Sequence, residues 1–191
     1  MQKQGTRMIL TLAFLIVQLL TFIELIRSMK YEYVYDVGVT TVFLIIYTVF
    51  EVKFKYHLSN YIRGTVILTI IGHNFFGEYL DLYITSPIFD RGLHIFGTYA
   101  FVLFIYSLLY KMNIKPLPQK SGIFIYVVLL GISLGTLFEI VEFLTDIMLK
   151  PEVQYQTDLV DTDLDLVCDV IGAIIAAFHI NKPYGFNIKK S

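Results

Sequence analysis

Apolar residues run almost unbroken through six segments of this 191-residue chain. Each segment approaches the roughly 20 helical residues that are needed to cross the hydrocarbon core of a bilayer. The segments are residues 8–26, 34–50, 62–83, 93–112, 122–149 and 161–180. The pattern therefore predicts an all-α fold, a polytopic membrane helix bundle with about six transmembrane helices.

Short polar breaks separate these segments. The stretch KMNIKPLPQKSG (111–122) carries Pro116 and Pro118, which prevent helix there, and KPEVQYQT (150–157) is a second break. The first apolar segment is longer than the apolar core of a signal peptide and no small-residue cleavage site follows it, so we interpret it as a retained span. No internal repeat or composition change divides the chain, which predicts one membrane domain over residues 1–191.

Composition supports the membrane assignment. The chain is 56% hydrophobic and 16% charged, whereas soluble domains are about 45–50% apolar and about 25% charged. The lipid bilayer is therefore the expected partner, and no nucleic-acid partner is expected. The single cysteine, Cys168, excludes a disulfide within the chain and a thiolate metal cluster.

Basic residues predict the orientation of the spans. Most Lys and Arg fall at the two ends of the chain, in the second-to-third loop and in the fourth-to-fifth loop. Because Lys and Arg favour cytoplasmic loops, both termini are expected to be cytoplasmic in a multi-pass protein of a bacterial plasma membrane. Of the sixteen Asp and Glu, only Glu51 falls on this cytoplasmic side. Acidic residues contribute little to topology, so the acidic outer side needs another explanation.

Two acidic stripes lie in the last two segments. Glu139, Glu142 and Asp146 are spaced i, i+3 and i+7, and each such set shares one face of a helix. The second set is Asp161, Asp165 and Asp169, spaced i, i+4 and i+8. Asp169 would lie near the bilayer midplane, where an unpaired carboxylate is costly. It must pair, take up a proton or face water. Glycines and alanines close to both stripes predict close helix packing there.

A third polar element lies between the third and fourth spans. His73 is expected near mid-bilayer, while Arg91 and His94 lie at the mouth of the fourth span. Pro87 suggests a re-entrant or interfacial loop, and irregular backbone at membrane depth must be buried in protein or line water. The sequence thus predicts a polar pocket, roofed by the Pro87 loop and open to the extracytoplasmic side.

The residues of the predicted pocket are assigned three roles. The expected acid/base groups are His94, Glu139 and Asp165, and a divalent cation is a candidate cofactor, held by Glu139, Glu142, Asp161 and Asp165. Such oxygen-rich ligands suit Mg²⁺, Ca²⁺ or Mn²⁺, or a mixed Zn²⁺ site. The residues expected to line the pocket, two of which are also possible cation ligands, are His73, Glu78, Asp90, Arg91, Glu142, Asp161 and Asp169.

Three motifs resemble those of a known family. They are FDRGLHIFGTYAF, GTLFEIVEFLTDIML and TDLVDTDLDLVCDVIGAIIAAF, and the resemblance as a whole covers roughly residues 72–178. Their order and spacing are similar to those of YjdF-like bacterial membrane proteins, which are related to the VanZ-like superfamily. The resemblance implies a multi-span inner-membrane protein. VanZ-like proteins are associated with glycopeptide resistance at the cell envelope, and this resemblance brings no mechanism with it.

The sequence leaves three functions open. The first is an envelope enzyme that acts on lipid or lipid-linked substrates at the outer leaflet. The second is a small cation-coupled or proton-coupled transporter, with Asp169, Glu139 and His73 as a relay. The third is a non-catalytic envelope or antibiotic-resistance factor, in which the acids pair internally and set helix packing. Only apolar residues, VIGAIIAAF (170–178), follow Asp169 directly, which favours the first function over the second.

Overall fold

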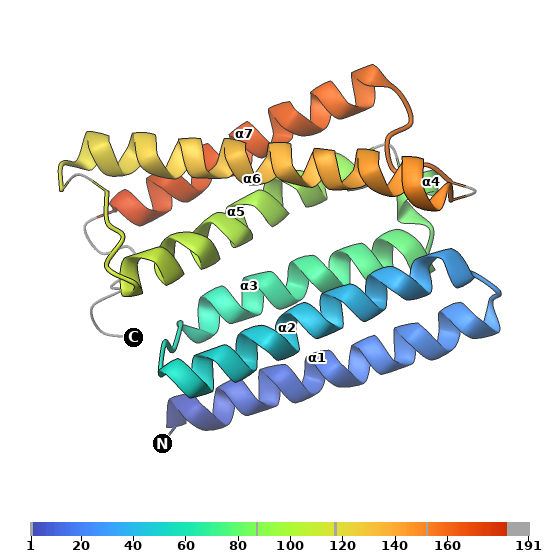
Figure 1. Ribbon diagram of the computed structural model, residues 1–191, viewed down its shortest axis with the longest axis horizontal. Helices are drawn as coiled ribbons and strands as arrows, with labels where there is room; N and C mark the ends of the chain where they lie inside the picture. The colour runs from blue at the N-terminus through green and yellow to red at the C-terminus, as the bar shows by residue number, and fades with distance from the viewer. Residues whose placement is uncertain (1, 87, 117, 152, 183–191) are drawn as a thin grey trace. The chain divides into compact units, whose positions relative to one another are not determined.

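The computed structural model describes residues 2–86, 88–116, 118–151 and 153–182. Within these ranges the regular structure is entirely helical (Figure 1). Four of the helices are long and apolar enough to cross a membrane, namely Gly5–Arg27, Tyr31–Phe54, Phe89–Lys111 and Lys120–Leu149. The all-α membrane bundle that the sequence predicts is therefore confirmed.

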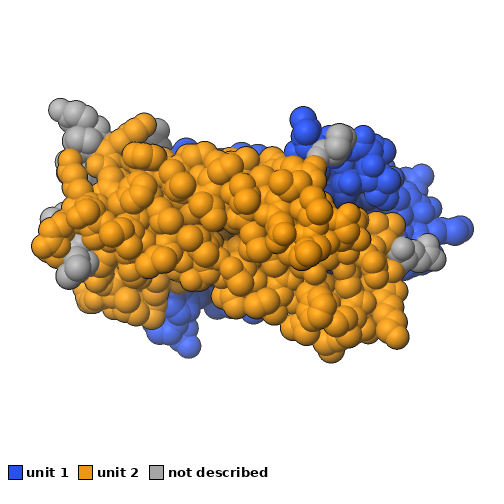
Figure 2. Space-filling view, turned by 90° about the horizontal axis from the view of Figure 1, so that it is seen from above, with its two compact units in different colours: residues 1–89, 191 blue, residues 90–190 orange. Residues whose placement is uncertain are grey.

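The chain packs as two compact units, residues 1–89 and residues 90–190, which Figure 2 colours separately. The helices of the first unit are α1 (Gln2–Arg27), η1 (Tyr31–Tyr33), α2 (Val34–Phe54), α3 (Asn60–Ile71), η2 (Gly72–Tyr79) and α4 (Leu82–Thr85). Those of the second unit are α5 (Phe89–Lys111), α6 (Lys120–Leu149) and α7 (Leu159–Asn181).

The third expected span, residues 62–83, is not one regular helix. It begins as α3, with Ser59 capping the helix by accepting from the Ile62 amide, and continues as the π-helix η2. The helical path ends at Asp81, whose φ of 58° lies in the left-handed region, which aspartate tolerates better than most residues. The sixth expected span is the helix α7, which begins two residues earlier than predicted, with Asp158 as its N-cap.

Three long elements of the first unit lie side by side. α1 contacts α2 and α3, and η2 extends α3 along the same helix (Figure 1). Fully buried apolar side chains fill the space between them, including Phe14 from α1, Leu44 from α2 and Ile62 from α3. Many large apolar side chains of α1 and α2 point outward instead. That arrangement suits helices whose outer faces contact lipid.

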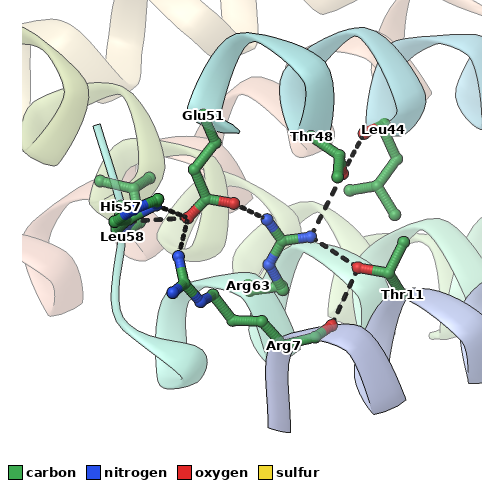
Figure 3. A network of polar contacts seen from close by, with 8 residues as sticks. All are labelled: Arg7, Thr11, Leu44, Thr48, Glu51, His57, Leu58 and Arg63. Carbon is green, nitrogen blue, oxygen red and sulfur yellow. Dashed lines mark hydrogen bonds and ion pairs between the residues drawn. The ribbon is translucent and has the colours of Figure 1, made fainter. Parts of the chain in front are cut away.

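One carboxylate joins the three helices near the α2–α3 turn (Figure 3). Glu51 of α2 accepts hydrogen bonds from Arg63 of α3, from Arg7 of α1 at 3.3 Å and from the Leu58 amide at 3.1 Å. Arg63 also donates to Thr11 of α1 at 2.8 Å. Ionised residues inside a membrane are costly unless they are paired, and here each helix contributes a partner.

Small residues bring the helices of the second unit together. α6 and α7 pack along each other, with Gly131 against Ala173 and Gly135 against the side chain of Asp169. A Cβ atom at Gly131 would collide with Ala173, and one at Gly135 would collide with the Asp169 carboxylate. Gly172 of α7 lies against the backbone oxygen of Ile95 in α5. Close approach through small residues is the common way in which membrane helices associate.

Candidate functional site

A buried histidine stands at the centre of the polar cluster in the second unit. His94 lies in the second turn of α5, with Asp90 one turn earlier on the same face. The imidazole Nε2 is 3.6 Å from Asp90 Oδ1. The opposite nitrogen, Nδ1, is 3.2 Å from Asp169 Oδ1 and 3.9 Å from Glu139 Oε1. Both ring nitrogens therefore face carboxylates, which come from all three helices of the unit.

Asp169 enters the cluster from α7 and is almost fully buried, with 2% of its surface exposed. Its Oδ1 accepts a hydrogen bond from Thr98, which lies one turn after His94 on α5. The absent side chain of Gly135 on α6 leaves the space that the carboxylate occupies. The position of Asp169 thus depends on both neighbouring helices.

Glu139 enters from α6 and is held by the segment that connects α6 to α7. Gln156 Nε2 donates to the backbone oxygen of Glu139 and to Glu139 Oε2, both at 2.9 Å. Asp146, two turns further along α6, accepts from the backbone amides of Tyr155 and Gln156 at 2.9 and 3.0 Å. The connecting segment is therefore tied to α6 beside the cluster.

Three buried carboxylate oxygens of this cluster lack a hydrogen-bond donor. They are Glu139 Oε1, Asp165 Oδ1 and Asp169 Oδ2. Buried polar atoms are normally satisfied, and each unsatisfied one costs about 1–3 kcal/mol. Protons, water or a cation could supply what these oxygens lack. Among these, only a multivalent cation binds several carboxylates at once and also offsets their mutual repulsion.

The cluster has the donor set of a divalent cation site. Two groups of side chains place their donor atoms within 4.8 Å of one another. One group is Asp90, His94 and Asp165, and the other is His94, Glu139 and Asp169. Carboxylate oxygens with one imidazole nitrogen suit Mn²⁺, Mg²⁺ or a mixed Zn²⁺ site.

Two acids that the sequence assigned to the cation site, Asp161 and Glu142, lie outside the cluster around His94. Asp161 pairs with Arg91 at 3.5 Å and accepts from Thr157 at 2.8 Å, at the start of α7. Glu142 is half-buried on α6. Neither Asp161 nor Glu142 is in the two converging groups, whereas Asp90 and Asp169, which the sequence assigned only to the lining, are.

His73 and Glu78 belong to the first unit, where they contact each other. Pro87, the expected roof of the pocket, lies outside the described residues.

Sequence reasoning missed two residues that position the acids, Thr98 and Gln156. Thr98 follows His94 by one helical turn, so a helical wheel of α5 places the two on one face. That signal was available. Gln156 lies in an irregular segment, and no periodicity indicates where its side chain points.

Comparison with known proteins supports the membrane assignment. A family model described as "Predicted membrane protein (DUF2238)" matches residues 7–182. A protein of Thermotoga maritima described as "Uncharacterized protein" is 34% identical over 105 residues. That match covers 55% of this chain and 54% of the Thermotoga protein, so the chain spans about half the length of this relative. No solved structure matches the chain.

Proposed function

The chain belongs to the DUF2238 family of membrane proteins, and we propose that its second unit is a cation-dependent hydrolase. In this proposal a divalent cation binds at His94, Glu139 and Asp169, and the substrate is a lipid or lipid-linked molecule of the cell envelope. The site opens to the extracytoplasmic side of a bacterial plasma membrane. One observation carries the proposal: three buried carboxylate oxygens without donors surround a histidine whose two nitrogens both face acids.

Each side chain has a role in the proposed site. His94 Nδ1, Glu139 Oε1 and Asp169 would bind the cation, and Asp90, whose Oδ1 lies 3.6 Å from Nε2, would orient the same imidazole. Metal-bound histidines usually donate their second N–H to such a carboxylate, which fixes the ring and its tautomer. Thr98 and Gln156 orient Asp169 and Glu139.

The proposed reaction is hydrolysis of an ester bond. A bound cation would supply a more acidic water and would polarise the ester. Asp165, whose buried Oδ1 lacks a hydrogen-bond donor, would accept a proton from the attacking water as the water oxygen bonds to the carbonyl carbon or phosphorus of the substrate. The bond to the leaving oxygen breaks, and Asp165 returns the proton to that oxygen.

A lipid-linked substrate is favoured by the surroundings of His94. The ring of Phe138 meets the ring of His94 edge-to-face at 5.7 Å. Phe138 is itself 45% exposed on a helix of membrane length. An acyl or prenyl chain in the bilayer can therefore reach an apolar side chain that touches the site.

Transport is less well supported by the same helix. The buried residues of α7 between Asp169 and His179 are Gly172, Ala173, Ala176 and Ala177, which offer no side-chain group to carry a proton or ion. A non-catalytic envelope or resistance role, as the VanZ-like resemblance suggests, remains an alternative that the experiments below separate from catalysis.

The first experiment is elemental analysis of the full-length protein purified in detergent, with thermal unfolding measured before and after chelator treatment. We expect about one Mn²⁺, Mg²⁺ or Zn²⁺ per chain and a lower melting temperature after chelation. Glu139→Gln and Asp169→Asn should each lower the affinity for the cation by about tenfold or more. Glu142→Gln, a half-buried acid on the same helix, is the matched control and should keep the affinity.

A protein without bound Mn²⁺, Mg²⁺ or Zn²⁺, or with the same content of these ions in Glu139→Gln and Asp169→Asn, would overturn the proposal. The second experiment distinguishes an enzyme from a non-catalytic envelope or resistance factor. The reconstituted protein is incubated with bacterial lipid extract, and ester products are measured by mass spectrometry with and without the cation. A cation that binds at His94 without any product formation would favour the non-catalytic alternative.

A further inference from the structure

The first unit contains a second buried polar cluster, which has no part in the proposed hydrolysis. Gln18 of α1, Thr40 of α2 and Asn74 of η2 meet there, and Glu78 lies one turn beyond Asn74. Gln18, Asn74 and Glu78 are each at most 2% exposed. η2 is a π-helix, a form that is rare and often occurs at functional sites.

Thr40 fixes the orientation of both amide groups. Its hydroxyl donates its single proton to a backbone oxygen of its own helix, Asp36 O at 2.8 Å. The hydroxyl oxygen can therefore only accept from Gln18 Nε2 at 3.2 Å and from Asn74 Nδ2 at 2.7 Å. The amide nitrogens point to Thr40, and Gln18 Nε2 also lies 3.2 Å from Thr41 Oγ1, which leaves Gln18 Oε1 and Asn74 Oδ1 buried without donors.

Glu78 adds two more buried oxygens without hydrogen-bond donors. The nearby ammonium group of Lys30 cannot serve them, because its contacts are already three: Asp81 Oδ1 at 2.6 Å, Tyr79 O at 2.9 Å and Glu78 O at 3.2 Å. An ammonium group has three N–H donors. The side chains that can still interact with the Glu78 carboxylate oxygens are therefore those of His73 and Asp36.

His73 approaches Glu78 from the same helix. Its Nε2 is 3.3 Å from Glu78 Oε1, and its Nδ1 is 2.6 Å from the Tyr83 hydroxyl. Gly77 permits this arrangement, because a Cβ atom there would collide with the Tyr83 ring. The Asp36 side chain, which is half-buried on α2, also interacts with the Glu78 carboxyl group. Two carboxyl groups this close repel each other when both are ionised, unless a proton or a cation joins them.

We propose that this cluster binds a hard metal cation, with Ca²⁺ as the ion that best matches its charge. The ligands would be the carboxylates of Glu78 and Asp36 and the amide oxygens of Asn74 and Gln18. Carboxylate and amide oxygens are the ligands that Ca²⁺ prefers. Two carboxylates balance the charge of a divalent ion, and the partial exposure of Asp36 gives the ion a route into the cluster.

This cation site is independent of the hydrolase proposal, since its ligands all belong to residues 1–89. Either proposal can fail while the other holds. The bound ion would join α1, α2 and η2, so its first effect is on the stability of the first unit.

The test uses the full-length protein in detergent after chelator treatment, with CaCl₂, MgCl₂ or NaCl added back. Binding is measured by calorimetry, and unfolding by the melting of helical circular dichroism. We expect Ca²⁺ to bind and to raise the melting temperature. Glu78→Gln should weaken binding about tenfold or more, and Asn74→Asp should strengthen it, because ligand charge sets affinity at such sites.

Two controls make the result specific. Glu24→Gln removes an exposed acid of the same unit, and Asp169→Asn removes a ligand of the other site. Both variants should keep the Ca²⁺ affinity of the first cluster. No response to any of the three salts, or an equal response in Glu78→Gln, would overturn the proposal. A response to NaCl alone would overturn the choice of Ca²⁺.

Discussion

Glu51 of α2 and Arg63 of α3 form an ion pair in which both side chains are almost entirely buried, at 3% and 1% exposed. Arg63 also lies over the Tyr47 ring, 5.1 Å from its centroid. The pair is the centre of the network in Figure 3. Removing one partner of a buried pair leaves an uncompensated charge, which costs far more than the pair contributes.

Glu51→Ala is therefore expected to destabilise the protein by about 3–5 kcal/mol. The matched control is Glu24→Ala, which removes an exposed partner of Arg27 on α1 and should cost about 0–1 kcal/mol. The measurement is reversible unfolding in mixed detergent micelles. The double variant Glu51→Leu/Arg63→Met should recover much of the loss, since the fully buried Arg63 charge is removed with its partner and Arg7, which also loses Glu51, is partly exposed. Equal losses in Glu51→Ala and Glu24→Ala would contradict the importance of this network.

Gly172→Ala is expected to destabilise the second unit. The new Cβ would meet the backbone oxygen of Ile95 and lie 3.1 Å from Thr98 Cβ, and backbone cannot yield as a side-chain end does. Overpacking of this kind costs about 1–3 kcal/mol. Gly92→Ala in α5 is the control, because nothing lies within 4 Å of its Cβ position. That variant should gain about 0.5–1 kcal/mol from helix propensity. A neutral Gly172→Ala would show that α5 and α7 can move apart.

Thr98→Val should weaken cation binding at His94 without removing a ligand. The hydroxyl of Thr98 donates to Asp169, and loss of such a supporting hydrogen bond lowers metal affinity by about 10–100-fold. Thr98→Ser retains the hydroxyl and should restore the affinity. Calorimetric titration with Mn²⁺ checks both variants. If the serine and valine variants bind alike, Thr98 does not orient Asp169.

Asp146→Ala should release the segment between α6 and α7. Asp146 accepts from two backbone amides there, those of Tyr155 and Gln156. Hydrogen exchange at these amides should become faster in the variant, and the free energy of unfolding should fall by about 1–3 kcal/mol. Asp163→Ala, which changes an exposed residue of α7, is the control. Unchanged exchange at residues 155 and 156 would show that other contacts hold the segment.

The all-helical membrane fold could be predicted from the sequence, because long apolar segments dictate it without reference to tertiary contacts. Helical spacing placed Glu139 on one face of its helix and Asp169 on one face of another, but which side chains meet depends on how the helices pack, and in the structure those two lie beside His94. Spacing did not separate Glu142 from Glu139. Both lie on one face of α6, but only Glu139 is oriented by Gln156, which comes from an irregular segment.

The third span shows the limit of reasoning from α-helical periodicity. On a regular α-helix Asn74, Glu78 and Asp81, spaced i, i+4 and i+7, would share one face. The π-helix and the left-handed Asp81 change that register, so that Glu78 faces His73 while Asp81 pairs with Lys30. Residue types alone do not reveal a π-helix, because its wider turns are selected by the packing around them.

The register of η2 also has a consequence for the tolerance of this chain to length changes. His73 and Glu78 are five residues apart, and in a regular α-helix they would point about 140° away from each other. Loss of a single residue between them would let the α-helix continue with the pair four positions apart, about 40° from each other, but it would rotate every residue that follows by about 100° relative to α3. Insertions and deletions within these eight residues should therefore be selected against more strongly than substitutions on their outward face, such as at the exposed Phe76.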